Sequence, residues 1–309
     1  MNSYQPYEAQ VKLLLDILPV VEQAGGFALK GGTAINLFLQ NMPRYSVDID
    51  LTYMLVEPRA IFLSHLTEKL NELSTKIKAA YPRLHTQKHY TQADKQLYRL
   101  SVSNDEVTIK IEPNLTLRGT LFDTQTVPLC KVAQEKFLQG MTVRLLSTGE
   151  IYAGKLCAAL DRQHPRDLFD VKILLDEQGI TPDITKAFVV YLASSPRPMH
   201  ELLNPNRKLD QKSLFEKQFA GMTTVPITYP ELEKAREKLF EVLHNTLTNE
   251  ERQFLISVKQ GEPNWVLLDL DEKNFNGWPA ILWKVQNIKK MDQKKHQLML
   301  DELKKVLDF

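Results

Sequence analysis

The first part of the chain alternates between helical and strand-like hydrophobic patterns. Apolar residues recur at helical spacing over residues 7–23, and a glycine pair then stops the helix. A short apolar run over residues 27–30 leads into a second glycine pair, Gly31 and Gly32, after which helical spacing returns as far as Phe38. The pattern therefore predicts a helix, a strand, a glycine turn and a second helix, in that order.

The next segment has the period-2 alternation of a strand with one apolar and one polar face. Val47, Ile49 and Leu51 alternate with Asp48 and Asp50. Successive side chains of a strand point to opposite faces, so the two aspartates are expected to project together from the polar face.

Further strands and then helices are predicted downstream. A long helix is expected over residues 57–80, and Asn104 and Asp105 are turn residues that predict a hairpin. The strand-like runs cover residues 84–91, 96–103 and 107–112, with more short strands between residues 121 and 145. Beyond these strands the pattern is almost entirely helical, from residues 147–162 and 165–175 to a last helix over residues 292–307. A turn-rich region over residues 194–230 is either a linker or an ordered loop.

Composition and charge limit the function classes only loosely. The 309 residues are 43% hydrophobic and 25% charged, as in an ordinary globular protein of about two domains. A net charge of +1 means that any contact with a polyanion requires a local basic patch. Cys130 and Cys157 are too few for a disulfide framework, and both are expected to be buried thiols. The N-terminus lacks a signal-peptide pattern and no apolar run approaches the roughly 20 residues that span a bilayer, so we expect a cytoplasmic protein with no membrane partner.

Asp48 and Asp50 are the centre of the candidate chemistry. Two carboxylates on one strand face suit two Mg²⁺ ions about 3.5–4 Å apart, as in phosphoryl transfer. The spacing alone is a weak signal, because Asp269 and Asp271 repeat it without an upstream glycine turn. Glycines in the turn over residues 30–33 let backbone amides approach a phosphate, and the following helix N-terminus adds a positive dipole end. We therefore predict a phosphate cradle beside a metal pair.

A third carboxylate is expected at Glu112, on a later strand. By alternation Lys110 and Glu112 share one face. Glu112 would share a metal and assist deprotonation of the incoming hydroxyl, while Lys110 would balance carboxylate or phosphate charge. The alternative is an ordinary salt-bridge pair at the surface.

Several sequence motifs together resemble the AbiEii/AbiGii group of nucleotidyltransferases, in the DNA polymerase β-like superfamily. The resemblance is carried by residues 29–38 with Arg44, Ser46, Asp48 and Asp50, by residues 110–112, by Lys155, Arg162, Arg166, Asp167 and Asp170, and by residues 279–288. It implies an α+β protein: a polymerase β-like nucleotidyltransferase domain over residues 1–180, with a mixed sheet flanked by helices, and a helical domain over residues 181–309.

The resemblance also implies a reaction and its partners. Such proteins include toxins of type IV toxin–antitoxin and phage-defence systems, and the related MenT toxins, which attach nucleotides to the 3′ end of tRNA. The implied enzyme transfers a nucleoside monophosphate from an NTP to an acceptor, expected to be tRNA, and releases pyrophosphate. The expected cofactor is Mg²⁺, as two ions, with Mn²⁺ as the alternative metal. A cognate antitoxin is the expected protein partner.

Residue roles follow from the same resemblance. Asp48, Asp50 and Glu112 would bind the metals, and Asp167 would complete the catalytic site. The nucleotide would be bound by Gly31, Gly32, Thr33, Lys110 and Lys155. Ser46 occupies the position that some antitoxins phosphorylate, which suggests a control point. Two positions depart from the superfamily pattern: Thr33 replaces the usual serine after the glycine, and Glu112 replaces an aspartate.

Other interpretations of the same residues stay open. One alternative is a nucleotidyltransferase whose acceptor is a protein or a small molecule. Another is a nucleotide-binding module without catalytic activity. For Lys155 and Asp167, the alternative to a catalytic role is a helix-to-helix salt bridge. For Ser46, the alternative to a control point is a hydrogen bond within its own loop. The histidines lack metal-ligand spacing, and the C-terminal lysines fit a solvated helix face better than an RNA-binding track.

Overall fold

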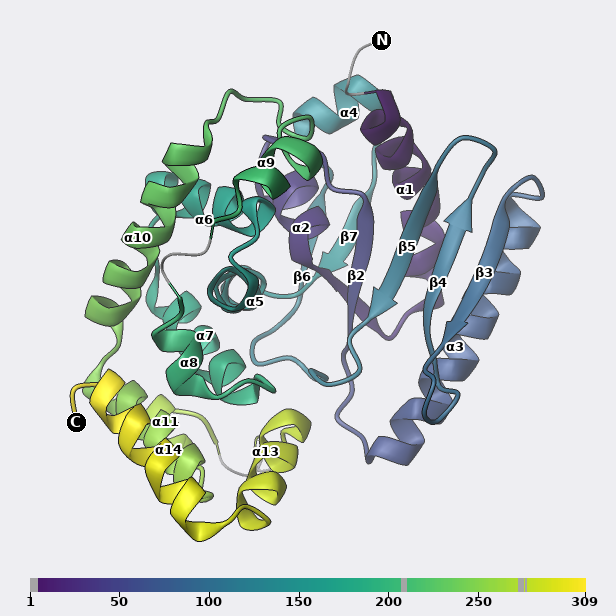
Figure 1. Cartoon of the computed structure of the whole chain (residues 1–309). Helices are drawn as coiled ribbons and strands as arrows, with labels where there is room; N and C mark the ends of the chain where they lie inside the picture. The colour runs from purple at the N-terminus through teal and green to yellow at the C-terminus, as the bar shows by residue number, and fades with distance from the viewer. Residues whose placement is uncertain (1–4, 207–209, 272–274, 276) are drawn as a thin grey trace. The chain divides into compact units, whose positions relative to one another are not determined.

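The computed structural model of the chain describes residues 5–206, 210–271, 275 and 277–309 (Figure 1). The chain divides into two compact units. The first unit comprises Met1–Ser147 and Ala220–Pro226, and the second unit comprises Thr148–Phe219 and Ile227–Phe309. Among the described residues, no helix is long and apolar enough to cross a membrane.

The first unit is built on a mixed sheet, which among the described residues has seven strands in the order β3-β4-β5-β2-β1-β7-β6 (Figure 1). The strands are β1 (Phe27–Lys30), β2 (Asp48–Tyr53), β3 (His85–Tyr90), β4 (Leu97–Ser103), β5 (Thr108–Pro113), β6 (Gln125–Pro128) and β7 (Thr142–Leu145). The central strand β2 is antiparallel to β1 and parallel to β5. The mixed sheet and the helices around it confirm the predicted α+β class.

Helices cover one face of this sheet. They are α1 (Gln5–Ala24) and α3 (Arg59–Ala80), and both contact the sheet as well as each other (Figure 1). Ile49 on β2, Ile111 on β5 and Leu100 on β4 lie side by side in register and are fully buried. The opposite face of the same strands carries the polar positions, as the period-2 pattern predicted.

The helix after the glycine turn has an irregular course. It begins as α2 (Gly31–Ala34) and continues as the π-helical segment η1 (Ile35–Leu39). The chain then reaches β2 through residues 40–47, in which Arg44 forms an isolated β-bridge with Thr223. Gly31 and Gly32 form the first turn of this helix directly after β1, and the predicted order of helix, strand, helix and strand is confirmed.

One element of the first unit was not predicted from the sequence. Short strands were expected between residues 121 and 145 and are present as β6 and β7, but α4 (Lys131–Phe137) lies between them. It has only seven residues, too few for a helical period to stand out against the neighbouring apolar runs. Leu138 ends it in the left-handed conformation, with φ of +53°.

The second unit consists of helices throughout its described part. They are α5 (Thr148–Arg162), α6 (Pro165–Glu177), α7 (Pro182–Ser194), α8 (Met199–Leu203), α9 (Lys212–Gln218), α10 (Tyr229–Thr246), α11 (Asn249–Gln260), η2 (Trp265–Leu268), α13 (Pro279–Lys289) and α14 (Gln293–Val306). By their contacts α5 and α6 belong to this unit, because α5 packs closely against α7 and α6 against α10. The compact units therefore divide near residue 147, whereas the expected domain boundary was near residue 180.

The proline-rich region is an ordered loop in its described part. It contains α8 and α9, and residues 220–226 then return to the first unit. There Met222 O accepts a hydrogen bond from Tyr45 N at 2.8 Å, and Thr224 Oγ1 donates to Met42 O at 2.8 Å. Cys130 and Cys157 are free thiols, as expected. Both are half-buried, whereas the sequence predicted that they are buried.

Candidate functional site

The sheet register brings the predicted carboxylates together. Asp50 on β2 pairs with Glu112 on β5 and with Lys30 on β1, while Asp48 pairs with Lys110. Neighbouring strands lie about 4.8 Å apart, so these side chains form a patch three strands wide on one face. The shared faces were predicted for each strand separately, and the structure adds that the two strands are neighbours.

The glycine turn contacts this patch directly. Gly31 has φ of +72°, a conformation that favours glycine. A Cβ atom at Gly31 would lie 2.3 Å from Asp50 Oδ2, which no side chain permits. A Cβ atom at Gly32 would lie 2.7 Å from Arg44 Nη2 and 2.9 Å from Ser46 Oγ. The backbone of the turn therefore lies against the Asp50 carboxylate, and any side chain would separate the two.

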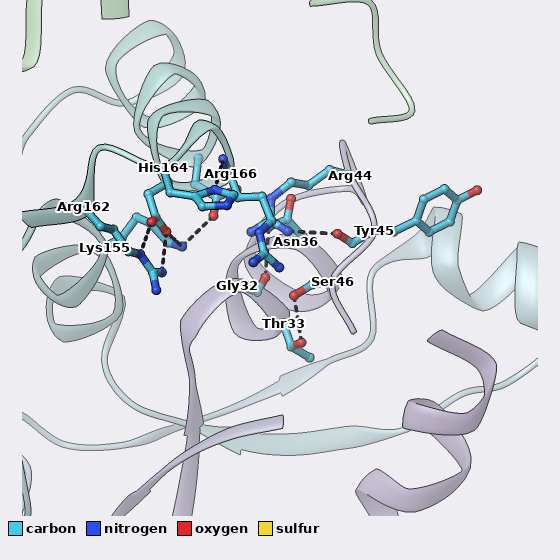
Figure 2. Close-up of polar contacts among 12 residues, drawn as sticks. Gly32, Thr33, Asn36, Arg44, Tyr45, Ser46, Lys155, Arg162, His164 and Arg166 are labelled. Atoms are coloured by element: carbon cyan, nitrogen blue, oxygen red, sulfur yellow. Dashed lines mark hydrogen bonds and ion pairs between the residues drawn. The ribbon is translucent and has the colours of Figure 1, made fainter. Parts of the chain in front are cut away.

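Thr33 joins the turn to the start of β2. Its hydroxyl is fully buried, donates to Asp48 O at 2.6 Å and shares a 3.1 Å hydrogen bond with Ser46 Oγ. Asn36 Nδ2 donates to Gly32 O at 2.9 Å and closes the turn from the other side. Figure 2 shows both the Thr33–Ser46 and the Asn36–Gly32 contacts. The Thr33 hydroxyl thus holds the backbone of the turn beside Asp48.

Glu112 has a basic partner on the next strand. Arg99 Nη1 on β4 lies 3.0 Å from Glu112 Oε1, and Arg99 Nη2 also donates to the Tyr98 hydroxyl at 2.7 Å. In the described part of the chain, no three or more His, Cys, Asp or Glu side chains are arranged to hold a metal ion. Mg²⁺ is commonly held by one or two carboxylates together with substrate phosphates. Asp48 and Asp50, as two oxygen donors beside a glycine turn, fit that kind of site.

Arg44 is a candidate residue that our residue-by-residue interpretation gave no role. Its side chain is buried at 2% exposure, its Nη1 donates to Tyr45 O at 2.9 Å, and its backbone pairs with Thr223. The contact with Gly32 places this guanidinium against the turn (Figure 2). A positive charge beside the backbone amides of the turn favours a bound anion. The only sequence signal for Arg44 was its position among the residues that carry the resemblance to the AbiEii/AbiGii group.

In the second unit, Lys155 lies between two buried aspartates. Its Nζ is 2.8 Å from Asp167 Oδ1 and 2.9 Å from Asp170 Oδ2, and Arg162 also contacts Asp167 (Figure 2). Lys155 is 7% exposed and both aspartates are 1% exposed. Burial opposes ionisation of Asp167, but Lys155 and Arg162 outweigh it and hold the pKa of this carboxyl well below its usual range. The pair expected from the motif is therefore a buried charge cluster rather than a surface salt bridge.

His164 begins α6 and serves as its cap. Its Nδ1 accepts a hydrogen bond from Arg166 N at 3.1 Å. Burial, with a smaller contribution from Arg166, lowers the pKa of His164 to about 4, so the ring is neutral at pH 7. This histidine therefore has a structural role at the start of α6.

The second aspartate pair of the sequence has a different setting. Asp269 follows η2 in the left-handed conformation, with φ of +52°, and is not on a strand. Its spacing from Asp271 therefore creates no shared strand face, which confirms that the glycine turn and strand context separate the two motifs.

The comparisons with known proteins bear on the family and the fold of the chain. The sequence model of the family described as "Nucleotidyl transferase AbiEii toxin, Type IV TA system" matches residues 12–287. Among solved structures, MenT4, a nucleotidyltransferase toxin from Mycobacterium tuberculosis H37Rv, is similar with a TM-score of 0.63 and 16% sequence identity, over 99% of this chain and 95% of that chain. A comparison with curated protein sequences gives no match. Since the family match covers most of the chain, the chain belongs to the AbiEii nucleotidyl transferase toxin family of type IV toxin–antitoxin systems.

Proposed function

We propose that the protein transfers a nucleoside monophosphate from an NTP to tRNA. An acceptor hydroxyl would attack the α-phosphate in line, and pyrophosphate would leave. The observation that carries the proposal is the contact between the Gly31 backbone and Asp50, with Asp48, Lys110 and Glu112 in register on the same face. A phosphate bound by the amides of the turn would lie next to the carboxylates.

The metal-binding residues proposed here are Asp48, Asp50 and Glu112. Two Mg²⁺ ions, or Mn²⁺ instead, would supply charge neutralisation at the attacking and leaving oxygens. Asp48 and Asp50 are the primary donors, because the turn lies directly against Asp50. Glu112 would join them by turning its carboxylate away from Arg99. Lys110, opposite Asp48, would balance the charge of the bound phosphates.

Backbone amides rather than side chains would bind the phosphates at the turn. Gly31 and Gly32 carry no side chain that would screen their amides, and the fully buried Thr33 would support the turn through the bond of its hydroxyl to Asp48 O. In the second unit, we propose that Lys155 contacts the triphosphate and that Asp167 holds the Lys155 ammonium in place. Asp167 and Asp170 fix the ammonium of Lys155, so a loss of activity on substitution there has to be separated from a loss of folding.

Ser46 is proposed as a control point for an antitoxin that phosphorylates it. Its hydroxyl lies beside Gly32 and hydrogen-bonds Thr33. A phosphate there would add nearly two negative charges at the turn and repel an incoming triphosphate. Ser46 is buried at 7% exposure, so a kinase would reach it only after the loop before β2 opens.

Label transfer with matched variants tests the reaction. The purified protein is incubated with each α-labelled NTP, Mg²⁺ and total tRNA. Asp50→Asn removes one charge at nearly constant shape and is expected to abolish transfer. Asp269→Asn is the control, because it makes the same change in an aspartate pair with no glycine turn, and asparagine tolerates the left-handed backbone there. Transfer that survives in Asp50→Asn contradicts the assignment.

The same assay separates the alternatives. Transfer to added protein or to an aminoglycoside, but not to tRNA, would retain the chemistry and replace the acceptor. Mg²⁺-dependent NTP binding with no transfer to any acceptor would instead identify an idle binding module. A cellular test follows from the toxin family: expression in the cytoplasm of a bacterial host should stop growth, and Asp50→Asn should restore it. Rescue by a gene encoded beside this one would identify the antitoxin, and survival of phage-infected cultures would test phage defence.

A further inference from the structure

The second unit contains a pocket that the proposed reaction does not use. It has a volume of about 110 Å³ and is lined entirely by residues of that unit, from the segment leading into α8 and from α11, α13 and α14. The residues that matter here are Lys259, Trp283, Lys284, Ile288, Met299 and Leu303. An empty apolar cavity of roughly 150 Å³ admits a benzene ring, so this pocket has room for one group of about that size.

Two lysines of the pocket have no negative partner among the residues that the structure describes. Lys259 is 6% exposed, and its Nζ contacts Met299 Sδ at 3.7 Å. Lys284 is half-buried and donates to Arg197 O at 3.4 Å. Within the described residues, no carboxylate lies within 4 Å of either ammonium. Lys155, in the same unit, shows the usual arrangement, since two aspartates neutralise it.

Burial and neighbouring positive charges lower the pKa of both pocket lysines. Burial, followed by repulsion from Lys259, lowers the pKa of Lys284 to about 8. Burial, followed by repulsion from Lys295, lowers the pKa of Lys259. Arg197 also lines the pocket but is paired with Asp161 and Glu201. The pocket therefore holds a surplus of positive charge that an anion would relieve.

An aromatic ring lies at the same place. Trp283 lines the pocket and is 49% exposed, whereas Trp265 and Trp278 are buried and pack against Phe275. Ile288 and Leu303 make the inner wall apolar. An exposed indole beside cations suits a flat base attached to a phosphate, because bases stack on aromatic side chains whatever their sequence.

We propose that this pocket binds a phosphorylated nucleoside, with the phosphate between Lys259 and Lys284 and the base on Trp283. The phosphate fits the enclosed volume and the base lies at the exposed rim. The ligand is either a free mononucleotide or one nucleotide of an RNA strand, since both present the same groups. The site is separate in sequence from the carboxylates of the first unit, and it does not depend on the transferase reaction.

Binding experiments on the full chain test the pocket. AMP is titrated into the protein in EDTA, which removes the metal that the proposed transferase site needs. We expect saturable quenching of Trp283 fluorescence. Lys259→Met and Lys284→Met should each weaken binding at least tenfold. Trp283→Ala should also weaken binding, and calorimetry measures this variant because it lacks the Trp283 fluorescence that the titration follows. Lys172→Met is the control, because Lys172 does not line the pocket and is already paired with Asp176. The methionine variants remove an unpaired charge, so they are expected to remain folded.

The outcomes separate this pocket from the proposed function. Binding that Asp50→Asn leaves unchanged and Lys284→Met weakens supports the pocket, even if no transfer is found. AMP binding identifies a free nucleotide as the source, and binding of a short RNA without AMP binding identifies an RNA strand. Equal affinity for AMP in the wild type and in both lysine variants would overturn the proposal. Inorganic phosphate that binds as tightly as AMP would also overturn it, because the base would then contribute nothing.

Discussion

Replacing Lys155 by methionine tests whether the buried charge cluster stabilises the second unit. Methionine keeps most of the apolar length of the side chain and removes the ammonium. The carboxylates of Asp167 and Asp170, both almost fully buried, then lose a partner at 2.8 and 2.9 Å. Arg162 still contacts Asp167 but is itself 62% exposed, so it replaces Lys155 only in part.

The expected loss is large relative to the stability of a domain. Breaking a buried ion pair by removing one partner costs roughly 3–5 kcal/mol, because the other charge stays buried without compensation. Domains are stable by only about 5–15 kcal/mol. Lys155→Met should therefore remove a large fraction of the free energy of unfolding of the second unit. Adding Asp170→Asn to it removes one of the two stranded charges and should recover part of the loss.

Urea unfolding followed by tryptophan fluorescence measures this effect. All three tryptophans, Trp265, Trp278 and Trp283, lie in the second unit, so the signal reports on that unit alone. The matched control is Lys172→Met, which breaks a more exposed pair with Asp176 at 2.7 Å in the same unit. Such surface pairs contribute about 0–1 kcal/mol. If Lys155→Met and Lys172→Met unfold at the same urea concentration, the cluster does not stabilise the unit and the reasoning is refuted.

Three further predictions follow from individual residues. Gly31→Ala should abolish transferase activity, because the new Cβ atom would lie 2.3 Å from Asp50 Oδ2. Gly25→Ala is the control: Gly25 has a similar φ of +64° but nothing within 4 Å, so this variant should keep activity at some cost in stability. Equal activity of the two variants in the label-transfer assay would contradict a role of the glycine turn in the reaction. The pKa of Asp167 is lowered in the folded state, so its stabilising contribution is complete above about pH 4 and is lost as the pH falls below that value, which unfolding midpoints between pH 2 and 6 would measure. The pKa of Lys284 falls from 10.5 to about 8, so Lys284→Met should stabilise the protein by up to about 3 kcal/mol below pH 8. That gain should shrink towards zero as the pH rises from about 8 to 10.5, and a gain independent of pH would contradict the unpaired ammonium.

The sequence alone predicted which side chains share a strand face at the candidate site. Period-2 alternation placed Asp48 with Asp50, and Lys110 with Glu112, each on one face, and the register confirms both pairs. Which strand lies next to β2 was not accessible, because β3 and β4 intervene in the sequence and pairing between distant strands leaves no local pattern. The contact of Glu112 with Arg99 depends on the same long-range pairing.

Local context explains what was missed and what was separated. The helix α4 is too short for periodicity to reveal, and residues 220–226 join the first unit through contacts with residues almost two hundred positions away. Asp269 and Asp271 repeat the aspartate spacing but lie outside any strand, and only the missing glycine turn signalled this difference. A spacing has chemical meaning only when the backbone conformation is known as well.

The sequence by itself determined the type of each long element, the polar face of β2 and the glycine turn ahead of it, because these depend on neighbouring residues through helical and strand periods. The tertiary structure alone decided that Gly31 touches Asp50, that Lys155 is buried between two aspartates, and that Lys259 and Lys284 share a pocket without a carboxylate among the described residues. Burial and pairing arise when segments distant in the chain pack together. The charge that a side chain experiences depends on that packing, whereas the sequence records only the side chain.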